Sequence, residues 1–243
     1  MTTRDRPRVS APTGGGPGYV RSMSDTGYGD FEFERKFFVR ELPAVVRTEP
    51  EPALIVQSYV LAADGYALRI RLEAPAGAVG GVYAPDPVGG AVDTDGLLSA
   101  LEGTVTFCAL TAKGPYVGGT RYEAERELDP MVGLAMVRRG GALVVKYRHS
   151  VWLGVDGWVI DEFLGDNAPL VVAECERGGP VTDLAIPDFC LTEVTDDPRF
   201  ANDALAGSPY GRWRGAFERE VALTGPRFLQ DFGHNELGLP SDV

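Results

Sequence analysis

Charged side chains alternate with phenylalanines in the segment DFEFERKFFV, which begins at Asp30. Because successive side chains of a β-strand point to opposite faces, Glu32, Glu34 and Lys36 share one face. Carboxylates are the ligands that hard divalent cations prefer, and an ammonium group binds the oxygens of an anion. The segment therefore predicts a strand with one face that suits both a metal and an anion.

The same alternation recurs along most of the chain. The charged positions of these later segments are Arg69 and Arg71 in YALRIRLE, Arg121, Glu123 and Glu125 in TRYEAERE, Lys146 and Arg148 in KYRH, Asp161 in WVIDEF, and Glu174 and Glu176 in VVAECER. Any one of them is typical of an antiparallel strand with a solvated charged face. Basic pairs on some strands and acidic pairs on others favour a closed barrel that encloses the charges.

Enclosed cations need anionic partners, because a buried unpaired charge has a large desolvation cost. A triphosphate supplies compact negative charge for the basic row, which is Lys36, Arg69, Arg71, Lys113, Arg121, Lys146 and Arg148. Glutamates can face such a polyanion only across a hard cation. Mg²⁺ or Mn²⁺ fits that position, with Glu32, Glu34, Glu174 and Glu176 as its ligands.

Length and composition limit the other possibilities. The chain has 243 residues, 44% of them hydrophobic, which suits one sizeable domain, and its 31 glycines and 18 prolines favour strands and turns. The net charge of −12 argues against nucleic-acid binding. Without an apolar run long enough to cross a bilayer, we expect a cytoplasmic protein that does not bind membranes. Cys108, Cys175 and Cys190 are expected to be buried free thiols.

Capping signals predict helices between the strands. Asp93 precedes DGLLSAL, Asp129 and Pro130 begin a segment that runs to Arg139, and Asp197 precedes a helix that ends at Gly207. We divide the chain into a flexible tail (1–28), a tunnel domain (29–210) with an insertion (74–102), and a helical extension (211–243).

The order of the motifs resembles that of the CYTH superfamily of triphosphate tunnel metalloenzymes. Glu32, Glu34 and Lys36 match its E-x-E-x-K signature. The later companions are QSYV, RIR, LTAKGP with TRYEAE, KYRH, WVIDEF, LVVAECE and EVTDDPRFAN, which together span residues 30 to 206. The resemblance implies an α+β fold, an eight-stranded antiparallel closed β-barrel with peripheral helices.

The resemblance also implies roles for the residues. The basic row would bind phosphates, and Glu32, Glu34, Glu174 and Glu176 would hold the metal, with Glu123, Glu125 and Asp161 as nearby ligands or water-positioning groups. Lys146 and Tyr59 match a catalytic lysine–tyrosine dyad, although an ordinary strand tyrosine remains the alternative for Tyr59. With Glu34, these two complete the predicted catalytic residues.

The implied activity is divalent-metal-dependent hydrolysis of a small triphosphate, with inorganic tripolyphosphate as the favoured substrate. Two alternatives stay open: an adenylyl cyclase that converts ATP to cAMP and diphosphate, and a non-catalytic module that binds polyphosphate or a nucleotide. The expected partner is a small-molecule triphosphate, and the protein is expected to be a monomer or homodimer.

Overall fold

The computed structural model describes residues 31–48, 51–79, 90–117 and 120–239. The strands are β1 (Phe31–Val39), β2 (Ala53–Ala63), β3 (Tyr66–Pro75), β4 (Phe107–Val117), β5 (Thr120–Glu127), β6 (Ala142–Leu153), β7 (Asp156–Phe163), β8 (Val171–Arg177), β9 (Ala185–Pro187), β10 (Cys190–Glu193) and β11 (Glu236–Leu239). The helices are α1 (Thr94–Ala100), α2 (Pro130–Val137), α3 (Asn202–Gly207) and α4 (Tyr210–Thr224), with 3₁₀ turns η1 (Ala44–Thr48), η2 (Ala76–Val79), η3 (Gly165–Asn167) and η4 (Pro198–Phe200). The predicted tail (1–28) and residues 80–89 of the predicted insertion lie outside the described residues.

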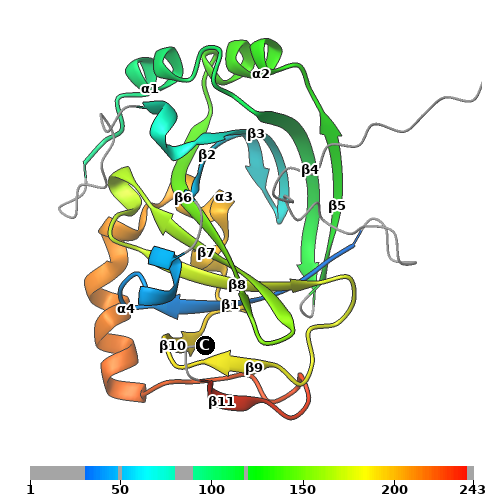
Figure 1. Ribbon diagram of the computed structural model, residues 1–243, viewed down its shortest axis with the longest axis vertical. Helices are drawn as coiled ribbons and strands as arrows, with labels where there is room; N and C mark the ends of the chain where they lie inside the picture. Colours follow the sequence, from blue (N-terminus) through cyan, green and yellow to red (C-terminus); the bar gives the residue numbers. More distant parts are fainter. Residues whose placement is uncertain (1–30, 49–50, 80–89, 118–119, 240–243) are drawn as a thin grey trace, which may run out of the picture.

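Eight antiparallel strands close into a barrel. They follow the order β1-β5-β4-β3-β2-β6-β7-β8, and β8 pairs again with β1, with Glu34 opposite Glu176 and Lys36 opposite Glu174. The short strand β10 pairs with Phe37, Phe38 and Val39 at the end of β1. This closure confirms the predicted fold, and Figure 1 shows the ring of strands with α3 visible through it.

The alternation read from the sequence separates the inside of the barrel from the outside. On β1, Phe33 and Phe37 belong to an outer hydrophobic cluster with Trp158 of β7. Phe31 departs from that pattern, since it is 52% exposed and its ring meets Tyr122 edge-on at a centroid distance of 6.3 Å. Phe31 is the first residue of the strand.

Two predicted helices cover the outer wall of β2, β3 and β4 (Figure 1). Asp93 accepts a hydrogen bond from Gly96 N at the start of α1, and Asp129 accepts from Met131 N and Val132 N at the start of α2. Both caps were expected from the sequence. The apolar sides of these helices pack on the barrel through Leu97, Leu98, Leu101, Leu134 and Val137.

An aromatic cluster closes one end of the barrel. The ring of Phe38, near the end of β1, meets the ring of Phe217 of α4 edge-on at a centroid distance of 5.0 Å. The ring centroid of Phe200 in η4 lies 4.9 Å from that of Phe217. The single helix predicted after Asp197 is wrong, because η4 ends at Phe200 and α3 begins at Asn202. That break directs the first residues of α3 towards the barrel interior.

The C-terminal part is only partly helical. α4 runs to Thr224, and Gly225 follows with a φ of 73°, a conformation that favours glycine. β11 then pairs in parallel with β9. The prediction of a helical extension over 211–243 is therefore wrong beyond Thr224.

Two composition-based expectations can be compared with the structure. All three cysteines are buried and free, as predicted. Among the described residues, no helix is both long and apolar enough to span a membrane.

Candidate active site in the barrel interior

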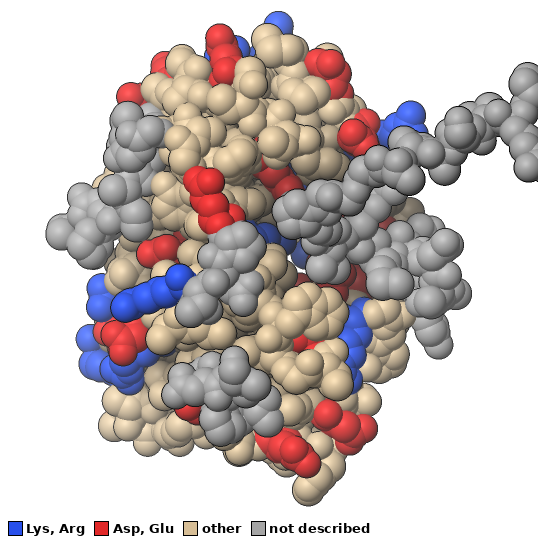
Figure 2. Space-filling model, in the orientation of Figure 1, with Lys and Arg blue, Asp and Glu red and all other residues tan. Residues whose placement is uncertain are grey.

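The charged rows face one another across the inside of the barrel. Register places Arg71 of β3 opposite Gln57 of β2, Lys113 of β4 opposite Glu123 of β5, and Arg148 of β6 opposite Asp161 of β7. In Figure 2, blue and red side chains are visible inside the hollow of the face shown. The strand pairing thus gathers the predicted anion-binding and metal-binding residues in one tunnel.

One network of ion pairs joins β1 and β8. Lys36 Nζ lies 2.9 Å from Glu34 Oε1 and 2.8 Å from Glu174 Oε1. Arg148 Nη2 lies 3.4 Å from the other oxygen of Glu174. Burial opposes the ammonium charge, but the two glutamates raise the pKa of Lys36 well above its ordinary value.

The same network continues to a buried carboxylate that holds two cations. Asp161 is 0% exposed; it accepts from Lys146 Nζ at 2.5 Å and from Arg148 Nε and Nη2 at 2.8 Å each. Burial alone would raise the pKa of Asp161, yet these cations hold it well below its usual range. Burial, reinforced by Arg148, lowers the pKa of Lys146 to about 8 despite Asp161. Lys146 can therefore exchange a proton near neutral pH.

A second network joins β1, β3, β4 and β5. Lys113 Nζ lies 2.6 Å from Glu32 and 2.8 Å from Glu123, and Arg69 Nη2 lies 3.4 Å from Glu123. Arg71 Nη2 reaches Glu125 at 3.0 Å. In this conformation Glu32, Glu123 and Glu125, predicted to contact a metal, are counter-ions of the basic row.

One arginine of the tunnel keeps a buried donor without an acceptor. Arg69 is 5% exposed, and its Nε has no hydrogen-bond partner within the described part of the chain. Arg71 Nε also makes no hydrogen bond there, but it lies 3.3 Å from Glu73 Oε1 in an ion pair. A buried donor left unpaired costs free energy, and an anion oxygen at Arg69 Nε would remove that cost.

The structure does not join the predicted dyad. Tyr59 pairs with Ala142 across β2 and β6, whereas Lys146 pairs with Ile55, so their backbones are about 13 Å apart along the strands. The hydroxyl of Tyr59 donates to Gln57 Oε1 at 3.2 Å, and the ammonium of Lys146 donates to Asp161. Arg121, predicted to bind phosphate, donates to the carbonyls of Gly114 and Gly65 in this conformation.

Sequence reasoning missed three residues of the tunnel. Glu73 continues the row of Arg69 and Arg71 and is 3% exposed, so the period-two alternation could have found it. The same alternation places Gln57 on the face of Tyr59. Asn202 of α3 accepts from Lys146 Nζ at 3.2 Å, a contact that no local pattern signals.

The carboxylates of β1 and β8 suit a hard cation in chemistry, but they are not assembled around one. Among the residues that the structure describes, no three His, Cys, Asp or Glu side chains are arranged to hold a metal. However, burial and the nearby Glu32 raise the pKa of Glu34 to about 7, and the same causes raise the pKa of Glu176 to about 7. Crowded oxygen ligands of this kind fit a divalent cation that would relieve their repulsion.

This crowding predicts a pH-dependent stability. Burial raises the pKa values of Glu34 and Glu73 from an ordinary 4.5 to about 7. Between these values the folded protein binds more protons than the unfolded chain, so the free energy of unfolding should fall as pH rises from about 4.5 to 7. Urea denaturation without divalent cations checks this expectation. The Glu34→Gln, Glu73→Gln double variant should show a flatter profile, and an equally steep one would contradict the assignment.

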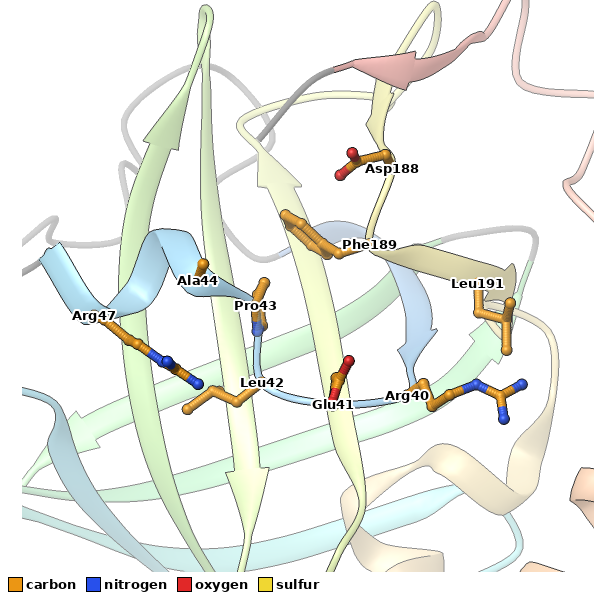
Figure 3. Close-up of a pocket in the computed structure, with 9 residues that line it drawn as sticks. All are labelled: Arg40, Glu41, Leu42, Pro43, Ala44, Arg47, Asp188, Phe189 and Leu191. Atoms are coloured by element: carbon orange, nitrogen blue, oxygen red, sulfur yellow. The ribbon is translucent and has the colours of Figure 1, made fainter. Parts of the chain in front are cut away.

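A second cavity, of about 460 Å³, lies outside the barrel. Figure 3 shows Arg47 and Arg40 at opposite ends of a group that includes Phe189 and Leu191. Glu41 and Asp188 also line it, so its charges balance. No residue of the predicted site lines this cavity, so the tunnel is the candidate active site.

Known proteins show similarity to this chain. Over 107 residues the chain is 33% identical to an inorganic triphosphatase of Acetivibrio thermocellus. The matched residues cover 43% of this chain and 69% of that relative. The solved inorganic triphosphatase NE1496 is 24% identical with a TM-score of 0.45, covering 73% of this chain and 96% of that one. HpAC1 from Hippeastrum, described as having a dominant triphosphatase activity, is 16% identical with a TM-score of 0.36, covering 80% and 88%. No family model matches the sequence.

Proposed function

This chain belongs to the CYTH superfamily of triphosphate tunnel metalloenzymes, and from that premise we propose that it is a divalent-metal-dependent triphosphatase. The proposed substrate is inorganic tripolyphosphate, and the proposed cation is Mg²⁺ or Mn²⁺. The similar protein of Acetivibrio thermocellus is named an inorganic triphosphatase, which supports this choice.

The two buried arginines of β3 support the proposal most strongly. Arg69 Nε has no hydrogen-bond partner in the described structure, and Arg71 Nε has only an ion pair with Glu73 at 3.3 Å, although other carboxylates lie in the same tunnel. Phosphate oxygens match the fork of donors that a guanidinium presents. A compact polyanion would satisfy Arg69 Nε and compete with the glutamates for the other donors of the tunnel.

The remaining residues divide the work of binding. The basic row would bind the phosphates, and Glu34 and Glu176, with Glu32 and Glu174, would hold the cation. When bound, a divalent cation supplies charge neutralisation at phosphate oxygens and activates water. Holding both reactants in fixed positions is the main contribution of a protein to phosphoryl transfer.

Lys146 is the proposed proton-transfer group. Its pKa of about 8 leaves it partly neutral in mildly alkaline solution, and Asp161 and Asn202 fix the direction of its ammonium. Because the Lys146 ammonium donates two of its three hydrogens to Asp161 and Asn202, one hydrogen remains for a substrate oxygen. A role for Tyr59 as the partner of Lys146 requires a substrate-bound state that brings the two side chains together.

A comparison of substrates tests the proposed function. Purified protein with Mg²⁺ or Mn²⁺ is expected to release phosphate from tripolyphosphate faster than from ATP or thiamine triphosphate, and release should stop when the cation is chelated. Formation of cAMP from ATP would favour the cyclase instead. Tight binding of tripolyphosphate without turnover would favour a non-catalytic module.

A further inference from the structure

A fully buried arginine lies between Glu34 and Lys36 in sequence, on the outer face of the same strand. Arg35 is 0% exposed; its Nε and Nη2 donate to the two carboxylate oxygens of Glu193 at 2.8 and 2.7 Å. Its Nη1 donates to Asn235 Oδ1 at 2.7 Å, and the ring of Phe232 lies 5.1 Å from the guanidinium carbon. This geometry fixes direction as well as distance.

Glu193 links this arginine to the backbone of Lys36. One oxygen of Glu193 accepts from Thr195 Oγ1 at 2.7 Å, and the other accepts from Leu229 N at 2.8 Å. Thr195 Oγ1 in turn accepts from Lys36 N at 3.0 Å, and Val194 N donates to Lys36 O at 2.8 Å. Both backbone groups of Lys36 are therefore held by the residues that follow Glu193.

The ion pair between Arg35 and Glu193 is better explained by the positions that it fixes than by a contribution to stability. Removing two charges from water costs about as much as their attraction returns, so buried pairs are weak evidence for stabilisation. The pair between Arg35 and Glu193 lies on the outer face of β1. The ammonium of Lys36 lies on the inner face, between Glu34 and Glu174 in the tunnel. A backbone fixed on the outer face limits where that ammonium can reach.

We propose that Arg35, together with Glu193 and the C-terminal segment 227–235, is a positioning clamp for Lys36. Arg35 touches neither substrate nor cation, and it acts through the backbone of β1. The role of Lys36 in binding triphosphate rests on the proposed function. The placement of the Lys36 backbone does not, so the two claims can fail separately.

Hydrogen exchange tests the placement without any activity. Arg35→Lys keeps the charge but loses the bidentate fork, and Asn235→Ala is a milder variant if Arg35→Lys does not fold. The Lys36 N–H is expected to exchange about tenfold faster relative to the amides of β3 and β4, as local opening predicts. Arg214→Lys, in the exposed pair of α4 with Glu218, is the matched control and should change nothing. An equal change at all barrel amides would show a purely structural role and overturn the clamp.

Kinetics then test the link to binding. Arg35→Lys, or Asn235→Ala, should raise KM for tripolyphosphate about tenfold and change kcat less than about twofold, because a binding contact is loosened. In a Lys36→Met background the same change should have no further effect on KM. Equal rises of KM in both backgrounds would overturn the coupling. A wild-type protein that neither binds nor hydrolyses tripolyphosphate would refute the proposed function and leave the hydrogen-exchange result to decide the clamp.

Discussion

Replacing Glu34 by Gln is expected to reduce metal-dependent phosphate release by about 100-fold or more, because an amide oxygen is a poorer ligand than a carboxylate and removes charge from the cation site. Glu176→Gln should act in the same direction, since Glu176 faces Glu34 across β1 and β8. The measurement is the initial rate of phosphate release from tripolyphosphate with saturating Mg²⁺ or Mn²⁺.

The same variant should fold at least as well as the wild type. Burial and Glu32 raise the pKa of Glu34 to about 7, so its charge is disfavoured in the folded protein. A neutral Gln removes that repulsion, and Tm at pH 8 should not fall. Glu218→Gln on α4 makes the same chemical change in an exposed pair and serves as the control. Rates within twofold of wild type in both tunnel variants would refute the proposed mechanism.

Removing Asp161 is expected to have the largest effect on stability. Asp161→Ala leaves two cations of the interior, Lys146 and Arg148, without their shared carboxylate. Removing one partner of a buried ion pair costs about 3–5 kcal/mol, whereas loss of the exposed pair between Arg214 and Glu218 costs about 1 kcal/mol or less. Urea denaturation at pH 7 of Asp161→Ala and Glu218→Ala compares the two.

Ligand binding sharpens this test. Tripolyphosphate supplies the negative charge that Asp161→Ala removes, so a saturating concentration should raise the Tm of the variant more than that of the wild type. Asp161→Asn keeps an acceptor and should lose less stability. A loss below about 1 kcal/mol for Asp161→Ala would show that Lys146 and Arg148 find other partners.

The sequence alone was sufficient for the fold and for most of the side chains that face the barrel interior. Period-two alternation separates Phe33 and Phe37 on the outer face of β1 from Glu34 and Lys36 on the inner face, and this rule is local. The family motifs supplied the closure of the barrel, which alternation alone does not specify. Helix caps such as Asp93 are local as well, and α1 and α2 begin where predicted.

Partner choice was not predictable, because the tunnel offers each cation several carboxylates. Lys113 pairs with Glu32 and Glu123, and Lys36 with Glu34 and Glu174, according to strand register. The separation of Tyr59 from Lys146 also follows from register. Such pairings depend on the stagger between strands that are distant in sequence.

The charged face of each strand was thus determined by the sequence itself, since alternation needs only neighbouring residues. Tertiary structure alone decided which charges meet, because residues brought together from distant strands compete for the same partners. It also brought Asn202 to Lys146, and it placed Arg35, an ordinary outer-face position in the alternation, in a buried pair with Glu193 and Asn235. Those contacts join parts of the chain separated by 56 to 200 residues, a distance over which no local pattern acts.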